Sequence, residues 1–188
     1  MFELFFATGN KHKILEINEI LKESGLDIKL VPIRGNKIEI QAETLEEIVS
    51  YALKQLKKKG VNYVIVEDAG LFINYFKGFP GPYSHYVYKK IGNKGILKLM
   101  DGIKDRSAYF KSVIGLIING NFKLFSGVAK GKIANEIRGR YGFGFDPIFI
   151  PEGYSKTFGE LQVSMKNRLS HRGKSARKLA EYLRHFFV

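Results

Sequence analysis

Short apolar runs alternate with segments of helical spacing over the first 70 residues, and this order constrains the fold more than any other feature of the sequence. Residues 2–7 form an apolar run that ends in Thr-Gly-Asn, and apolar residues then recur at helical spacing from residue 14 to residue 21, in a stretch that ends at Ser24-Gly25. Residues 28–31 and 63–66 form two further apolar runs, with a second helical pattern between them. The order strand, helix, strand, helix, strand favours a sheet with helices packed on its faces.

The second helical pattern carries the clearest start signal in the chain. Thr44 is followed three residues later by Glu47, which is the arrangement of a capping box. Apolar residues then mark one helical stripe: Ile48, Val49, Ala52, Leu53 and Leu56. The sequence therefore predicts an amphipathic helix that begins after Thr44.

The second half of the chain has a different character. Residues 107–118 and 122–131 are strand-like and flank Asn119-Gly120, a dipeptide typical of tight hairpin turns. A long antiparallel hairpin is therefore expected. Short helices are predicted before it, as far as residue 100.

The remaining segments complete one domain. A loop is predicted over residues 138–147, a strand over 148–150 and a terminal helix from Ser170. No repeat or linker interrupts the order of elements. We therefore expect a single α/β domain over residues 1–188, with a mixed sheet flanked by helices and bent into two lobes around a cleft.

Composition and apolar run length exclude several classes of protein. The chain contains no cysteine, which excludes disulfide bonds, cysteine-ligated zinc and thiol nucleophiles. The longest apolar runs, such as residues 113–118, are far shorter than the roughly 18 residues that a membrane span requires. Residues 1–7 contain Glu3 and lack a basic leader with a cleavage site, so they are interpreted as a strand and not a signal peptide. We expect a soluble, cytoplasmic protein with no membrane partner.

The chain carries 31 lysines and arginines against 18 aspartates and glutamates, a formal net charge of +13. Such a surplus favours anionic partners, which include nucleic acids, acidic membranes and phosphorylated small molecules. The basic residues are mostly scattered along the chain and do not form one tract. The charge therefore limits the partner to an anion without identifying it.

The first candidate site follows the first predicted strand. Thr8, Gly9 and Asn10 form a turn between that strand and the next helix, and Lys13 lies one turn into the helix. Free backbone N–H groups at a helix N-terminus bind phosphate, and the lysine would add a full charge. The alternative is structural: Asn10 caps the helix and Lys13 is solvated.

The second candidate site is a pair of adjacent carboxylates, Glu67 and Asp68, at the point where we expect the third strand to end. Ligands in open α/β sheets bind beyond the carboxyl ends of strands, and both side chains reach one cleft only if the strand ends there. With Glu39 upstream, they form a set of hard oxygen ligands that suits Mg²⁺ shared with the phosphates of a substrate. The alternative is that Asp68 caps a turn and Glu67 is exposed.

Two further segments complete the candidate site. Residues 142–147 alternate glycine with phenylalanine and end in Asp-Pro, so the backbone can approach a ligand and the rings can stack on a flat base. Residues 166–172 place several basic side chains around a helix N-terminus, where cations are unfavourable unless an anion lies nearby. The alternatives are a turn with phenylalanines in the core and an ion-rich surface helix.

In this order, the four segments resemble the inosine triphosphate pyrophosphatase family over essentially the whole chain. The motifs that carry the resemblance are Thr8-Gly9-Asn10-x-x-Lys13, Glu39-Ile40-Gln41, Glu67-Asp68-Ala69-Gly70-Leu71, Gly78-Phe79-Pro80-Gly81-Pro82-Tyr83-Ser84, Phe143-Gly144-Phe145-Asp146-Pro147-Ile148-Phe149 and Lys166-Asn167-x-x-Ser170-His171-Arg172. The resemblance implies a hydrolase that converts the non-standard purine nucleotides ITP, dITP and XTP to the monophosphate and pyrophosphate with Mg²⁺, and that forms a homodimer. It also implies an elongated α/β domain with a strongly twisted mixed sheet and a central cleft.

The resemblance assigns roles to particular residues. It implies that Glu39 and Asp68 bind the metal and that Asp68 is the base for the attacking water. It implies a larger set for binding the nucleotide: Thr8, Gly9, Asn10, Lys11, His12, Lys13, Ala69, Phe143, Gly144, Phe145, Asp146, Lys166, His171 and Arg172. Attack at the α-phosphorus is implied by the resemblance alone.

Three positions depart from the family pattern. Ala69 stands where serine is common, and Met165 replaces the usual glutamate before Lys-Asn. The lysine often found in the second helix corresponds to either Ala52 or Lys54, so that helix contributes no residue to the predicted site.

The predicted chemistry is charge neutralisation. A triphosphate carries about four negative charges, and we expect Lys13, Lys166 and Arg172 to neutralise it together with the metal. Two alternatives remain. One is a nucleic-acid-binding module without turnover, which suits the net charge, Arg138 and Arg140 beside an aromatic loop, and the basic last helix. Its carboxylates would repel phosphates, so nucleic acid is not expected as the main ligand. The other is a pyrophosphatase of broader nucleotide preference.

Overall fold

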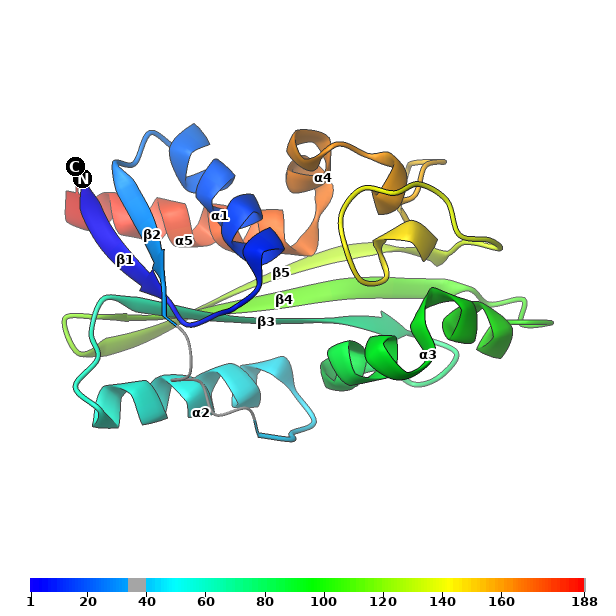
Figure 1. The fold of residues 1–188 in the computed structure, drawn as a ribbon, viewed down its shortest axis with the longest axis horizontal. Coiled ribbons are helices and arrows are strands. Elements are labelled where there is room, and N and C mark those ends of the chain that lie inside the picture. Colours follow the sequence, from blue (N-terminus) through cyan, green and yellow to red (C-terminus); the bar gives the residue numbers. More distant parts are fainter. Residues whose placement is uncertain (34–39, 188) are drawn as a thin grey trace.

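A computed structural model of the chain describes residues 1–33 and 40–187, and Figure 1 shows its fold. Within those residues the strands form a six-stranded sheet in the order β2-β1-β3-β4-β5-β6. Their bounds are β1 (Phe2–Phe6), β2 (Ile28–Pro32), β3 (Val64–Ile73), β4 (Ser107–Ile118), β5 (Asn121–Ile133) and β6 (Phe149–Pro151). β1 is parallel to β2 and β3, and the other neighbours are antiparallel, so the sheet is mixed as predicted.

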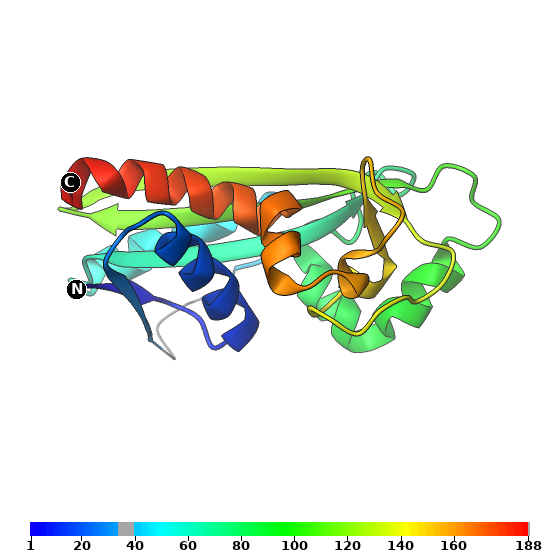
Figure 2. The ribbon, with the colours of Figure 1, turned by 90° about the horizontal axis from the view of Figure 1, so that it is seen from above.

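The helices pack on both faces of the sheet. Their bounds are α1 (Lys11–Glu23), α2 (Leu45–Lys58), α3 (Ser84–Leu99), α4 (Val163–Leu169) and α5 (His171–Phe187), with short 3-10 turns at η1 (Gly81–Tyr83), η2 (Asp146–Ile148) and η3 (Phe158–Glu160). At the end of the molecule where both termini lie, α1 and α5 cover one face and α2 covers the other (Figures 1 and 2).

Alternation along β3 separates these two layers. Ile65 packs with α1 and α5, whereas Val64 and Val66 pack with α2. The capping box predicted at the start of α2 is present, because Thr44 Oγ1 accepts from Glu47 N–H and Glu47 Oε2 accepts from Thr44 N–H. The helix therefore begins where the sequence predicts, with its apolar stripe against the sheet.

A second lobe lies at the other end of the molecule, where α3, β6 and nearby loops surround a separate apolar core (Figures 1 and 2). Phe149 and Phe158 are among its fully buried side chains, and each such burial contributes about 1.5–3 kcal/mol. The predicted β4–β5 hairpin is confirmed and runs through both lobes. Its turn lies at Asn119 and Gly120, which have φ angles of 49° and 74°.

The third strand is longer than the sequence predicts. The apolar run predicts an end at Val66, but β3 continues to Ile73. The reason is β4, which pairs with β3 at every position from Val64 to Ile73. This pairing provides hydrogen-bond partners for the backbone of residues 67–70, although these residues do not continue the apolar run. Glu67 and Asp68 therefore lie within the strand and point to opposite faces, so the prediction of a carboxylate pair at a strand end is wrong.

The other local differences are small. α3 has non-helical backbone angles at Gly92, which agrees with the predicted short helices up to residue 100. The predicted strand over residues 148–150 is shifted by one residue, because η2 precedes it. α4 was not predicted and lies directly before α5. In the described part of the chain, every helix is too short or too polar to span a lipid bilayer.

Candidate active site

The site begins where β3 loses its strand neighbour on one side. β1 pairs with only the first two residues of β3, and among the described residues the edge beyond them has no further strand ladder. Side chains replace part of that ladder: Lys13 Nζ donates to Glu67 O at 3.3 Å, and Asp68 Oδ1 accepts from Ala69 N–H at 3.0 Å. Because the edge is open, side chains from both faces of the sheet can reach one cleft.

A cleft of about 890 Å³ lies along this edge. Its walls are the start of α1, the edge of β3, α3, the loop of residues 142–146 and the first turn of α5. It brings together Asp68, the predicted base and metal ligand, and most of the residues predicted to bind the nucleotide: Thr8, Gly9, Asn10, His12, Lys13, Ala69, Phe143, Gly144, Phe145, Asp146, His171 and Arg172.

Three predicted residues are not in the cleft wall as described. Lys11 is exposed at the start of α1, and Lys166 is buried behind the wall. Glu39, the second predicted metal ligand, lies outside the described residues.

Four helices begin at this cleft. The N-termini of α1, α2, α3 and α5 lie near the middle of the molecule (Figure 1), and each places a residue of its first turn in the cleft wall: His12, Ile48, Ser84 and His171. Each helix N-terminus acts as roughly half a positive charge, so the arrangement favours an anion. At α1 the cap predicted as an alternative is present, because Asn10 Oδ1 accepts from the N–H groups of His12 and Lys13.

A buried ion cluster of three basic and three acidic side chains lies against the cleft wall: Lys13, Lys166, Arg172, Glu16, Glu67 and Asp146. Lys13 is the most exposed of them, with 16% of its side chain accessible. The cluster joins residues that are far apart in the chain, because α1, β3, the 142–146 loop, α4 and α5 each contribute at least one member.

Arg172 connects the two halves of the buried ion cluster. Its Nη1 lies 2.6 Å from Glu16 Oε2, and its Nη2 lies 3.1 Å from Glu67 Oε1. Lys166 Nζ lies 2.7 Å from both Glu16 Oε1 and Asp146 Oδ2. These carboxylates are the anions that the basic segment 166–172 was expected to require, and they come from within the chain.

The ionisation of the buried ion cluster follows from these contacts. Burial by itself raises the pKa values of Glu16 and Glu67, but the adjacent basic side chains lower both below their ordinary values. Burial raises the pKa of Asp146 despite its contact with Lys166. Burial opposes the charge on Lys166, but its two carboxylate partners raise its pKa. With all six groups ionised the charges sum to zero, so these cations bring little net charge to the cleft.

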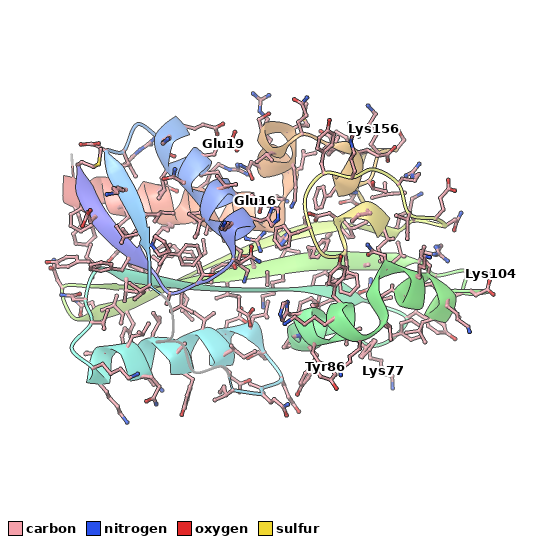
Figure 3. All side chains as sticks on the ribbon, in the orientation of Figure 1. Glu16, Glu19, Lys77, Tyr86, Lys104 and Lys156 are labelled. Atoms are coloured by element: carbon pink, nitrogen blue, oxygen red, sulfur yellow. The ribbon has the colours of Figure 1, made fainter. Side chains whose placement is uncertain are left out.

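Glu16 is the functional candidate that sequence reasoning missed. It lies on the buried side of α1 with Ile17 and Ile20, and its residue is 3% exposed. Glu16 and Glu19 both project from α1 on the side of α4 (Figure 3), where Glu19 accepts from Asn167 Nδ2 at 2.7 Å. A carboxylate on the apolar stripe of a helix is the signal that would have identified it, because a buried charge requires a partner.

The aromatic side chains of the 142–146 loop have different surroundings. Phe143 is half-buried and stacks on His12 with ring centroids 5.1 Å apart, and Arg172 lies 5.3 Å from its ring. Phe145 is only 3% exposed and packs edge-on against Tyr88, so most of its ring belongs to the core. Phe143 is therefore the better surface of the two for stacking a flat base.

His171 is a buried, neutral imidazole in the cleft wall. Its ring stacks on Phe110 with centroids 4.6 Å apart. Burial, reinforced by the charges of Arg172 and Lys166, holds its pKa well below the ordinary value. Its Nδ1 has no hydrogen-bond partner among the described residues.

Comparison with known proteins identifies relatives over nearly the whole chain. The sequence model of the Ham1 family matches residues 4–182. A dITP/XTP pyrophosphatase from Hyperthermus butylicus is 50% identical over 97% of this chain and 95% of its own length. One from Pyrococcus horikoshii is 51% identical, with 97% of each chain covered. Among solved structures, a HAM1 protein from Coxiella burnetii has a TM-score of 0.83 at 30% identity, covering 98% of this chain and 100% of its own.

Proposed function

The chain belongs to the Ham1 family, and on that premise we propose that it hydrolyses the non-standard purine nucleotides ITP, dITP and XTP to the nucleoside monophosphate and pyrophosphate. Relatives with 50% and 51% identity over nearly the full length carry the name dITP/XTP pyrophosphatase. The reaction would remove abnormal purines from the nucleotide pool.

The observation that carries this proposal is the convergence of distant segments on one cleft. Residues of α1, β3, the 142–146 loop and α5 line a space of about 890 Å³, which lies within the range of pockets that hold small ligands. The cleft combines the half-buried aromatic ring of Phe143, a carboxylate and several helix N-termini. These are the groups needed for a base, a water molecule and a polyphosphate, respectively.

Asp68 is the proposed base for the attacking water. Its carboxylate lies in the cleft wall and is half-buried, and the N–H of Ala69 holds Oδ1 at 3.0 Å. This contact fixes the orientation of the carboxylate on a rigid strand, which general-base catalysis requires. Attack at the α-phosphorus then releases pyrophosphate.

Mg²⁺ is the proposed cofactor, with Asp68 and Glu39 as its ligands. No three His, Asp or Glu side chains of the described residues form a metal cage. Mg²⁺ does not need one, because it is commonly held by one or two carboxylates together with waters and substrate phosphates. Asp68 in the cleft therefore fits this mode of binding. When bound, the ion would stabilise negative charge on the phosphates.

The other predicted residues receive binding roles. Thr8 to Lys13 are proposed to bind the triphosphate, and Phe143, His171 and Arg172 to enclose the base and sugar. Lys166 is proposed to act from behind the cleft wall, by holding Asp146 and thereby the loop that carries Phe143. Discrimination against adenine requires a donor for the 6-oxo group, and each such contact is worth roughly 10- to 100-fold.

Two further properties are proposed from the resemblance. We expect a homodimer and a cytoplasmic location. Sedimentation of the purified chain, whose mass is 21.4 kDa, would test the first.

The decisive test is a product assay with a panel of nucleotides. ITP, dITP, XTP, dUTP, ATP and GTP are incubated separately with the protein and Mg²⁺, and pyrophosphate and orthophosphate are measured in parallel. We expect rapid release of pyrophosphate from ITP, dITP and XTP, slow release from the other nucleotides, and no reaction after removal of Mg²⁺ by chelation. Orthophosphate as the direct product would contradict the proposal. Equal rates with ATP and GTP would indicate the broader pyrophosphatase.

A further inference from the structure

The basic side chains of the cleft differ in what they contact. Among the described residues, the lysines and arginines in the cleft wall are Lys13, Lys89 and Arg172. Lys13 lies 2.7 Å from Glu67 Oε2, and Arg172 is bound to two carboxylates of the buried ion cluster. Both charges are therefore already balanced within the protein before any substrate enters.

Lys89 differs from these two residues. It is an exposed residue of α3 that lines the cleft, and no described carboxylate lies within 4.0 Å of its ammonium group. Among the described residues, its charge therefore has no ion-pair partner. An anion that enters the cleft can therefore gain a charge-assisted contact from Lys89 without breaking an ion pair.

The polyphosphate needs such a contact. It carries about four negative charges, and helix N-termini offer only partial charges. At α1 that contribution is reduced further, because Asn10 already accepts from the N–H groups of His12 and Lys13. A full positive charge from α3 would provide the attraction for phosphate that the buried ion cluster, whose charges sum to zero, and the capped N-terminus of α1 do not provide.

Hydrogen bonds on both sides of Lys89 connect α3 to other parts of the cleft wall. Before it, Ser84 Oγ accepts from Leu71 N–H at 2.8 Å and donates to Gly81 O at 2.7 Å. After it, Asn93 Nδ2 donates to Gly144 O at 3.2 Å. The first contact ties α3 to β3 and the last ties it to the 142–146 loop, so both sides of the cleft position this segment.

We propose that Lys89 is a substrate-binding residue that holds the phosphate groups, on a wall of the cleft that contributes none of the predicted binding residues. This inference rests on the proposed function for the identity of the substrate. The ligand chemistry itself, a polyphosphate anion, can be tested without turnover.

The next residue in the chain provides a matched control. Lys90 is also exposed and on α3, but it does not line the cleft. Its ammonium lies 5.6 Å from the centroid of the Tyr86 ring, and Tyr86 points away from the body of the molecule (Figure 3). Lys89→Gln and Lys90→Gln thus remove the same charge from adjacent positions, inside and outside the cleft.

The experiment combines kinetics with direct binding. KM and kcat are measured with XTP, and binding of inorganic triphosphate is measured by calorimetry with Mg²⁺ present. For Lys89→Gln we expect KM to rise and triphosphate affinity to fall, each by roughly 10- to 100-fold, with kcat within about twofold. Lys89→Arg should keep both KM and the affinity for triphosphate close to the wild-type values. Lys90→Gln should match the wild-type protein, and all variants should have the same melting temperature because both side chains are exposed.

Two outcomes separate this inference from the proposed function. If Lys89→Gln and Lys90→Gln bind triphosphate equally well, Lys89 is not a phosphate-binding residue and the inference is wrong. The second outcome is that the wild-type protein binds triphosphate but releases no pyrophosphate from any nucleotide, and that only Lys89→Gln weakens the binding. In that case the proposed function is wrong and Lys89 remains an anion-binding residue.

Discussion

Glu67 and Asp68 are neighbours in the chain but have opposite surroundings. Glu67 is 1% exposed and contacts Lys13 and Arg172, which lower its pKa despite burial. Asp68 points to the other face of β3 and lies half-buried in the cleft wall. Glu67 therefore forms ion pairs within the protein, whereas Asp68 lines the cleft in which a substrate would lie.

Asp68→Asn is expected to abolish most of the turnover while leaving the fold intact. The amide has the same shape but cannot accept a proton, so pyrophosphate release from XTP should fall by roughly 10²- to 10⁴-fold. The free energy of unfolding should change by less than about 1 kcal/mol, because the side chain is not in the core. Asp101→Asn, at an exposed position after α3, is the control. Near-normal kcat in Asp68→Asn would exclude Asp68 as the base.

Glu16→Gln is expected to destabilise the protein strongly. Glu16 neutralises both Lys166 and Arg172 in a buried setting, and its replacement leaves these cations without one of their anions. Breaking a buried ion pair from one side costs about 3–5 kcal/mol, which urea unfolding would measure. Glu19→Gln on the same helix should cost less than about 1 kcal/mol, because Glu19 lies nearer the surface. Equal effects of the two substitutions would show that the buried ion cluster contributes little.

The pKa of His171 predicts a loss of stability in mild acid. Burial holds its folded-state pKa well below the ordinary value, so as the pH falls through about 6.5 the unfolded chain binds the extra proton first. The stability contributed by the neutral ring is present above pH 6.5 and decreases below it, by at most about 1.4 kcal/mol per pH unit. Urea unfolding at several pH values should show this slope in the wild-type protein and a shallower one in His171→Gln. His185→Gln, at an exposed position, should retain it.

At the scale of elements, the packing of α5 on β5 determines where the first turn of α5 lies. Gly127 of β5 allows this close approach, because an added Cβ atom would lie 2.1 Å from His171 O and 2.5 Å from Ser175 N. The same turn carries Arg172, which connects the two halves of the buried ion cluster. The position of a strand glycine thus affects two side chains of the cleft wall.

Gly127→Ala is therefore expected to impair both stability and activity. The added methyl group must displace α5, at a cost of roughly 1–3 kcal/mol, and kcat/KM for XTP should fall because His171 and Arg172 move with the helix. Gly120→Ala in the hairpin turn is the control. Gly120 has a φ of 74° and no atom within 4 Å of an added Cβ, so this variant should lose about 1–2 kcal/mol without any change in kcat/KM. Full activity in Gly127→Ala would show that the contact is not needed.

Local sequence signals correctly predicted those features that depend on residues close together in the chain. The capping box at Thr44 and the Asn119-Gly120 turn are examples, because each is decided by interactions between residues close in the chain. The end of β3 could not be predicted in the same way. Its length depends on pairing with β4, some 40 residues away, and no local pattern records that pairing.

At the scale of the whole molecule, the surplus charge lies outside the buried ion cluster. The cluster is balanced when ionised, so the net charge of +13 comes from the remaining, mostly exposed residues. Such a surface attracts anions over a distance and thereby raises association rates at low salt. The net charge therefore affects how fast an anionic substrate reaches the protein, and it does not determine the chemistry of the site.

This distribution predicts a salt effect on substrate capture. As salt increases from about 50 to 300 mM, kcat/KM for XTP should fall by roughly 3- to 10-fold while kcat stays nearly constant, because screening weakens steering but not the bound state. An uncharged osmolyte at equal osmolarity is the control. The same samples test the alternative of a nucleic-acid-binding module: tight, salt-sensitive binding of bulk RNA without release of pyrophosphate from any nucleotide would favour it.

The sequence by itself determined the order of most elements, the mixed sheet and the hairpin, because periodicity, caps and turns depend on neighbours in the chain. Most of the residues that meet in the cleft were expected from the family resemblance that the sequence motifs carry. Tertiary structure decided the rest. It extended β3 beyond Val66, recruited Glu16 into the buried ion cluster and balanced Lys13, Lys166 and Arg172 with carboxylates. The physical reason is that a charged side chain can be buried only if oppositely charged partners surround it, and those partners come from segments that only folding brings together.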